Sequence, residues 1–178
     1  MIKAINLPWK TFWQTRTVKD RQCRRAMRRI LTMTGSTTRL LEQLSGRRLQ
    51  VNTEFQKGMG GVQEAEIVRM TRLHLGSADA PVILSISSLA PANLTQREIA
   101  DIRGGEIPLG TIFCANGAKL WKSGICFKVL DDSRLARKLN VTDSRLFSKE
   151  YILWTGNRRV GIVKEIFNQE SIKRIWRS

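Results

Sequence analysis

Alternation of residue type marks one stretch as a core strand, Ile67-Val68-Arg69-Met70-Thr71-Arg72-Leu73-His74-Leu75. Successive side chains of a strand point to opposite faces of its sheet. Arg69 therefore falls on the face that also carries Ile67, Thr71 and Leu73. The stretch predicts a strand with one arginine turned toward the core.

A second stretch follows the same rule, Val160-Gly161-Ile162-Val163-Lys164-Glu165-Ile166-Phe167. It places Glu165 on a face with Val163 and Phe167. A charge on a core-facing position costs free energy unless it is paired or binds a ligand. Arg69 and Glu165 therefore form one buried salt bridge or lie at a solvated strand end, or they belong to a polar site in an apolar pocket. The pattern leaves these alternatives open.

The rest of the chain predicts an α+β fold with a single, mostly antiparallel sheet. Helices are expected at 18–33, 37–44 and 94–102, and strands at 49–55, 64–75, 81–90, 121–129, 149–155 and 160–167. The strand at 121–129 is expected to face the core with Trp121, Ser123, Ile125, Phe127 and Val129. At 178 residues the chain suits one domain, 1–178, with one core.

Basic residues are concentrated near the start of the chain. Residues 1–60 hold 13 Lys and Arg against 3 Asp and Glu, and the whole chain has a net charge of +16. Half of the early excess lies in 19–29, which is a solvated helix face or a binding surface for nucleic acid, an anionic membrane or an acidic partner. No RNA-recognition, KH or zinc-finger signature accompanies it, so we expect no specific nucleic acid. Peripheral contact of 19–29 with an anionic membrane stays an alternative.

Several classes of protein are excluded by what the sequence lacks. No run approaches 18 apolar residues and no secretory signal pattern opens the chain, so we expect a cytoplasmic protein. Cys23, Cys114 and Cys126 form no CxxC pair, and with one histidine they predict a reducing compartment and no metal site. Ser87-Ser88 has no histidine placed to activate it, and no GxSxG, Walker or GxGxxG motif is present.

Four short motifs follow one another in a recognisable order. They are Gly35-Ser36-Thr37-Thr38-Arg39-Leu40-Leu41-Glu42, the Arg69 strand with the loop before Pro81, Ile107-Pro108-Leu109-Gly110-Thr111-Ile112-Phe113, and Val163-Lys164-Glu165-Ile166-Phe167. Together they resemble the chorismate pyruvate-lyase (4-hydroxybenzoate synthase) family over residues 30–168. Residues 1–29 then form a basic N-terminal segment outside the match.

The resemblance implies a sheet of about six antiparallel strands, with helices covering an enclosed ligand cavity. It implies a lyase of the kind used in quinone biosynthesis, which converts chorismate to 4-hydroxybenzoate and pyruvate by eliminating the enolpyruvyl group without metal or organic cofactor. By motif, Arg69 holds the ring carboxylate and Glu165 is the acid/base at the other end of the ring. These two are the catalytic residues and also bind substrate, as Leu109 and Ser36 do. We expect Arg69 and Glu165 in one cavity, and a monomer.

The residue types suit that chemistry. Arginine offers a planar fork for a carboxylate. A glutamate in apolar surroundings moves a proton near neutral pH. Because the ring becomes aromatic, positioning plus one acid/base group suffices. The positive net charge also attracts a dianionic substrate.

The chain departs from the family at the penultimate strand. Lys149-Glu150 stands where many relatives have paired arginines, so the partner of the second substrate carboxylate is not identified. One alternative is a non-catalytic aromatic-acid-binding domain of the same fold, which turnover of chorismate would separate from the enzyme. The other is a basic protein that binds nucleic acid or a membrane surface, which salt-sensitive binding without turnover would favour.

Overall fold

The computed structural model describes residues 3–6, 21–58, 66–76, 81–115 and 117–176. The strands are β1 (Lys3–Asn6), β2 (Gln50–Lys57), β3 (Ile67–His74), β4 (Pro81–Leu89), β5 (Leu120–Asp131), β6 (Arg145–Thr155) and β7 (Arg158–Phe167). The helices are α2 (Arg21–Thr32), α3 (Thr37–Ser45), α4 (Gln96–Gly104), α5 (Leu109–Cys114), α6 (Ser133–Lys138) and α7 (Gln169–Ile175), with a 3-10 turn at Pro91–Asn93.

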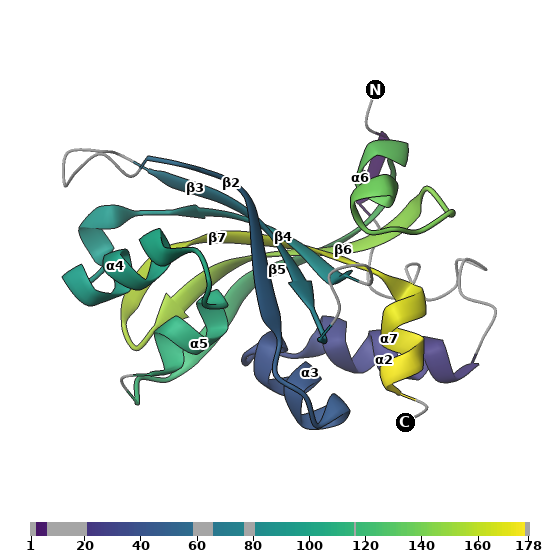
Figure 1. Cartoon of the computed structure of the whole chain (residues 1–178), viewed down its shortest axis with the longest axis horizontal. Helices are drawn as coiled ribbons and strands as arrows, with labels where there is room; N and C mark the ends of the chain where they lie inside the picture. The colour runs from purple at the N-terminus through teal and green to yellow at the C-terminus, as the bar shows by residue number, and fades with distance from the viewer. Residues whose placement is uncertain (1–2, 7–20, 59–65, 77–80, 116, 177–178) are drawn as a thin grey trace.

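All seven strands pair antiparallel in one sheet, in the order β1-β5-β6-β7-β4-β3-β2. The predicted α+β class with a single antiparallel sheet is confirmed. Six of the strands are long, and β1 adds a four-residue edge strand that the sequence pattern did not predict. Strands β4 and β7, distant in sequence, meet near the middle of the sheet (Figure 1).

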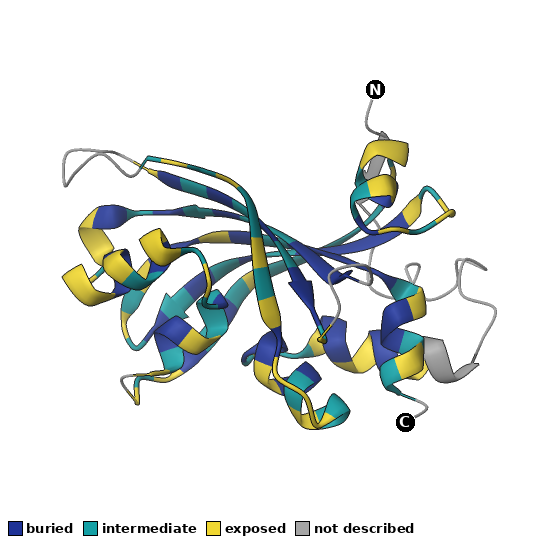
Figure 2. Cartoon of the chain, viewed as in Figure 1, coloured by how far each residue is buried: buried dark blue, intermediate teal, exposed yellow. Residues whose placement is uncertain are grey.

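The helices gather in two groups on one face of the twisted sheet (Figure 1). Helices α2, α3 and α7 lie at one end and cover a hydrophobic cluster that includes Met27, Leu41 and Phe167. Helices α4 and α5 lie at the other end over a cluster that includes Ile102 and Phe113. Helix α6 packs on the opposite face, against a third cluster. In Figure 2 the central strands are mostly buried, whereas α4 and α6 expose their outer turns.

Polar side chains occupy the covered face between the first two clusters. Cross-strand register aligns Thr71, Ser85, Glu165 and Lys149 in one row. Arg69 lies in the neighbouring row. Arg69 is 2% exposed, Glu165 is 6% exposed and Lys149 has no exposed surface. The predicted orientation of Arg69 and Glu165 toward the core is therefore confirmed.

Local capping fixes the two ends of α3, which lies at the predicted helix 37–44. The Ser36 side chain accepts a hydrogen bond from the Arg39 backbone N–H at 3.2 Å, and a serine in this position satisfies a free N–H of the first turn. Gly46 ends the helix with a φ of +65°, a conformation that glycine adopts without steric cost. The N-terminus of α3 is thereby held at one place over the sheet.

Helix α2 lies within the predicted helix 18–33 and carries the described part of the basic segment 19–29. Ala26, Met27, Ile30 and Leu31 are fully buried against the sheet. Arg25, Arg28 and Arg29 are exposed, and Arg29 lies over the Trp176 ring beyond α7. The apolar side of α2 therefore belongs to the core. Lys19, Asp20 and most of the expected loop at 76–80 lie outside the described residues.

The expected orientation of strand β5 is wrong for its first half. A bulge between Ser123 and Cys126, with Gly124 at a φ of +58°, shifts the register by an extra residue. Trp121 consequently faces away from the helices and stacks on Trp154, with ring centroids 4.9 Å apart. Lys122 takes the core-facing position instead, opposite Leu153. Across the described residues, no helix is long and apolar enough to cross a membrane.

Candidate functional site

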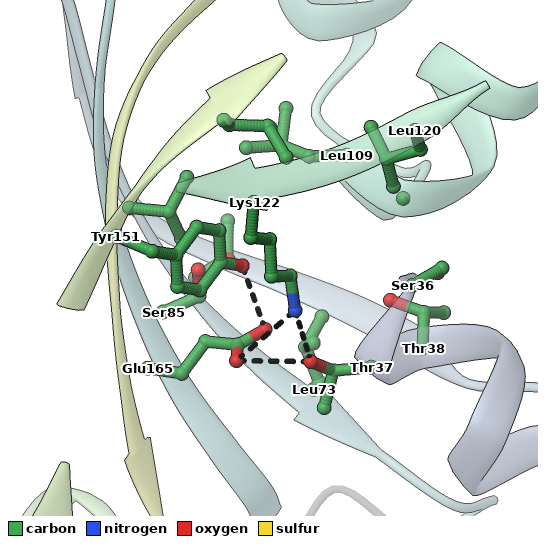
Figure 3. A pocket seen from close by; sticks show the side chains of 14 residues that line it. Ser36, Thr37, Thr38, Leu73, Ser85, Leu109, Leu120, Lys122, Tyr151 and Glu165 are labelled. Carbon is green, nitrogen blue, oxygen red and sulfur yellow. Dashed lines mark hydrogen bonds and ion pairs between the residues drawn. The ribbon is translucent and has the colours of Figure 1, made fainter. Parts of the chain in front are cut away.

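A small cavity lies between the sheet and the N-terminal ends of α3 and α5 (Figure 3). Its apolar wall includes Leu73, Leu109, Leu120, Leu153 and Val163. Its polar wall includes Ser36, Thr37, Thr38, Lys122, Tyr151 and Glu165. The free space is about 30 Å³, which is room for a water molecule or two. The cavity is thus a closed polar centre between the two hydrophobic clusters.

Glu165 is the anion at this centre, and three side chains from different elements surround it (Figure 3). The Tyr151 hydroxyl on β6 donates to Glu165 Oε1 at 3.0 Å. The Thr37 hydroxyl, in the first turn of α3, donates to Oε2 at 3.0 Å. Lys122 Nζ on β5 lies 3.8 Å from Oε2. The carboxylate is therefore oriented by hydrogen bonds and partly neutralised by one lysine.

Lys122 is the only cation among the described residues that lines the cavity. Its Nζ donates to Thr37 Oγ1 at 2.6 Å and lies 4.3 Å from the centroid of the Tyr151 ring. Burial lowers the pKa of Lys122, and the Glu165 carboxylate opposes that shift. Burial and the same carboxylate raise the pKa of Tyr151, so its hydroxyl stays a donor.

Lys149 lies behind this group and joins it to helix α2. Its Nζ donates to the carbonyl oxygens of Ile30, at 3.4 Å, and of Met33. The C-terminal end of a helix presents such carbonyls and carries partial negative charge. Burial and the nearby Lys122 lower the pKa of Lys149 to about 7. Lys149 therefore changes its charge near neutral pH.

Gly110 explains why the Pro-Leu-Gly motif meets α3 so closely. A Cβ at this position would lie 2.5 Å from Ser36 Oγ and 3.1 Å from Thr38 Oγ1. Only glycine allows α5 to approach the N-terminus of α3 at this distance. The motif thereby brings Leu109 into the cavity wall and closes its roof.

Arg69 is placed differently from the expectation. Its guanidinium donates to the carbonyl oxygens of Gly105, at 2.7 Å, and Ile107, at 3.2 Å, and to Thr53 Oγ1 at 3.4 Å. Burial lowers the pKa of Arg69 to about 10, so it remains charged at neutral pH. It holds the connection between α4 and α5 against the sheet.

The structure thus brings Ser36, Leu109 and Glu165 to one cavity but leaves Arg69 out of its lining. Among the described residues, no ion pair joins Arg69 to Glu165, so the buried salt bridge is not formed either. The reason is where the long side chain reaches: its head group bonds to Thr53 on the edge strand β2 and to the backbone between α4 and α5, away from β7.

Sequence reasoning missed Lys122 and Tyr151 as site residues. Lys122 was hidden because the bulge at Gly124 breaks the alternation from which the strand was interpreted. Tyr151 carried a usable signal, since it is the only tyrosine of the chain and follows Lys149-Glu150 directly. No group of three His, Cys, Asp or Glu side chains able to hold a metal occurs within the described ranges.

Comparison with solved structures identifies the fold. The chain is similar to the ligand-binding domain of a protein assigned to the GntR family of regulators from Bordetella bronchiseptica, with a TM-score of 0.50 and 12% identity over 67% of this chain and 85% of that one. It is also similar to YydK, a candidate transcriptional regulator from Bacillus subtilis, with a TM-score of 0.52 and 12% identity over 72% of this chain and 60% of that one. At this identity the likeness shows the fold alone, which is the chorismate lyase-like fold.

Sequence comparisons add no family assignment. No family model matches the chain. No curated protein matches it either. The resemblance to the chorismate pyruvate-lyase family stays a prediction carried by the four motifs.

Proposed function

We propose that this protein binds a small aromatic or cyclic carboxylic acid in the cavity beneath α3 and α5. The observation that carries the proposal is the Glu165 centre, where Lys122, Thr37 and Tyr151 converge inside an apolar wall. A few convergent polar groups in an apolar pocket are typical of small-molecule sites. The first structural neighbour is described as a ligand-binding domain, which supports the same class of function.

Binding requires the roof of the cavity to move. The free space is about 30 Å³, whereas pockets that hold small molecules measure roughly 300 Å³ or more. The roof consists of the first turns of α3 and the six-residue helix α5, which touch at Gly110. An outward shift of α5 separates these turns without breaking a strand pair. We therefore expect ligand binding to change the exposure of α5.

Titration with 4-hydroxybenzoate tests the proposal directly. Isothermal calorimetry is expected to show saturable binding to one site per chain. Hydrogen exchange of residues 105–115 is expected to change on binding, whereas exchange in β6 and β7 stays the same. Lack of saturation up to about 1 mM ligand contradicts the proposal.

A second candidate function is the elimination of pyruvate from chorismate. The observation that favours it is Glu165 itself, which stands in the matching motif and is held by Tyr151 and Thr37 at 3.0 Å each. In that reaction a base removes the proton from the ring carbon that bears the hydroxyl. The neighbouring carbon–oxygen bond breaks, the ring becomes aromatic and enolpyruvate leaves, taking up a proton to give pyruvate. Glu165 would be the base.

Incubation of the pure protein with chorismate separates the two candidates. The lyase produces 4-hydroxybenzoate and pyruvate in equal amounts, detected by chromatography, and a chelator does not stop it. A binding domain of the same fold retains 4-hydroxybenzoate affinity but releases no pyruvate above the rate of the Glu165→Gln variant.

A further inference from the structure

Three charged side chains meet at the cavity or directly behind it, and two of them are lysines: Lys122 in its lining and Lys149 behind. Lys122 has a side chain 1% exposed, Lys149 has no exposed surface, and Glu165 has a side chain 8% exposed. One carboxylate neutralises one lysine, so the second lysine has no anion of its own among these three. Buried charge of one sign is costly unless it is compensated. The centre is therefore short of one negative charge whenever both lysines are protonated.

The hydrogen bonds of Lys149 show how the closed centre avoids that cost. Its Nζ donates to two backbone carbonyls, those of Ile30 and Met33. A neutral amine has two N–H groups and one lone pair. The nearby positive charge of Lys122 favours this neutral form, since it helps to lower the pKa of Lys149. Above about pH 7 one ammonium, Lys122, thus faces one carboxylate in the closed state, and Lys149 completes the group without charge.

Arg69 cannot bind the acid group of a ligand without losing its own hydrogen-bond partners. Its head group donates to Gly105 and Ile107, two carbonyls of the α4–α5 connection. Transfer to a ligand would leave the Ile107 carbonyl without its donor and the Gly105 carbonyl with the Thr53 hydroxyl alone, and an unsatisfied, part-buried carbonyl is costly. The first turn of α3 also lies on the lysine side of the cavity, and a helix N-terminus favours an anion.

We infer that the acid group of the ligand binds at Lys122, with Lys149 directly behind it, and not at Arg69. This inference rests on the proposed binding function and names the part of the ligand that the site recognises. An arriving carboxylate brings the missing negative charge, and Lys149 takes up a proton to match it. Binding of an acid is therefore coupled to proton uptake.

The direction of the pH dependence follows from the groups that face Lys149. The titratable ones are Lys122 on β5, Tyr151 on its own strand and Glu165 on β7, while Ile30 at the end of α2 and Met33 just after it present backbone carbonyls. A bound carboxylate raises the pKa of Lys149 above about 7. The affinity for an acid is therefore higher at the acidic side of neutrality and falls as the pH rises.

A pair of ligands of equal shape tests the inference. Calorimetry compares 4-hydroxybenzoate with neutral 4-hydroxybenzamide, on wild type and on Lys122→Met. Wild type is expected to prefer the acid, and Lys122→Met to lose roughly 30-fold or more in affinity for the acid but little for the amide. Lys128→Met is the matched control, because Lys128 lies on the same strand, on the face away from the cavity, and pairs with Glu150.

A measurement on unmodified protein covers the case in which Lys122→Met does not fold. Titrations with 4-hydroxybenzoate in two buffers of different ionisation enthalpy, near pH 8, are expected to show uptake of a fraction of a proton per ligand bound. The amide is expected to show none. Zero uptake with the acid overturns the inference.

The remaining outcomes separate this inference from the proposed function. If wild type binds neither ligand, both are overturned. If wild type prefers the acid and Lys122→Met keeps that preference, the inference alone falls. Loss of the preference in Arg69→Met, but not in Lys122→Met, would return the acid group to Arg69.

Discussion

Arg69 and Glu165 lie on the same face of one sheet, yet they are held in different ways. Arg69 is bonded mainly to backbone carbonyls, those of Gly105 and Ile107. Glu165 is bonded to side chains that come from β6 and α3. Backbone partners are part of the fold and cannot be exchanged without moving a segment. Side-chain hydroxyls and amines can turn toward a ligand, so we assign structure to the first region and ligand chemistry to the second.

The two regions also meet helix ends of opposite polarity. Arg69 faces the carbonyl that caps the C-terminal end of α4, where a cation is favoured. Glu165 accepts from Thr37 in the first turn of α3, where an anion is favoured. Helix ends therefore stabilise both charges, but only the α3 end opens into the cavity. The contrast teaches that a buried charge marks a ligand site only when its partners can change.

The largest effect on stability is expected from Arg69→Met. The substitution removes the charged donor of the Gly105 and Ile107 carbonyls, of which only Gly105 keeps a second donor, the Thr53 hydroxyl, so we expect a loss of about 2–4 kcal/mol in the free energy of unfolding. Chemical denaturation measures it. Arg97→Met, on the exposed side of α4, is the control and should stay within about 0.5 kcal/mol. A stable Arg69→Met protein that no longer binds 4-hydroxybenzoate would reverse the assignment of the two regions.

Glu165→Gln is expected to separate stability from chemistry. The amide keeps the shape and can still accept from Tyr151, and Lys122, which loses its carboxylate, can become neutral because burial already lowers its pKa. The free energy of unfolding should therefore change by only about 1–2 kcal/mol. If the protein is a lyase, pyruvate release should fall by roughly 100-fold or more, because an amide cannot move a proton. Glu150→Gln, on the outer face beside Lys128, is the control. Unchanged turnover in Glu165→Gln would show that Glu165 is not the base of the proposed reaction.

Lys149 should make stability depend on pH. Its pKa is about 7 in the folded protein and about 10.4 in an unfolded chain, so between these values the unfolded chain binds more protons. Stability therefore rises with pH through this window, by roughly 1 kcal/mol per pH unit, and below it Lys149 is protonated in both states. Melting curves of Lys149→Met from pH 7 to pH 9 should lack this slope. An equal slope in both proteins would show that Lys149 keeps its charge when folded.

Gly110→Ala should have a small effect on stability but a clear effect on the roof. The added Cβ would meet Ser36 Oγ at 2.5 Å, so α5 must move away from α3 at a cost of about 1–2 kcal/mol. Gly104→Ala is the control, since a Cβ there meets nothing within 4 Å. We expect faster hydrogen exchange in α5 for Gly110→Ala only. Unchanged hydrogen exchange would mean that the Ser36 side chain moves aside and that α5 keeps its position against α3.

The sequence by itself determined what depends on near neighbours in the chain. Alternation put Arg69 and Glu165 on the covered face, because side chains of a strand alternate whatever packs on them. The sequence also predicted a helix at 37–44, where α3 lies, because caps such as Ser36 and Gly46 act within one helical turn. The antiparallel sheet followed from short turns between strands. These features need no knowledge of distant contacts.

Only the tertiary structure decided which groups share the cavity. The bulge at Gly124 turned Lys122 inward, against the alternation of its strand, because a register shift depends on pairing with β6. Arg69 donates to the carbonyls of Gly105 and Ile107 because the connection between α4 and α5 lies within reach of its side chain. Lys149 met the end of α2, which lies more than a hundred residues earlier in the chain. Each of these contacts joins distant segments, and local patterns carry no information about where such segments meet.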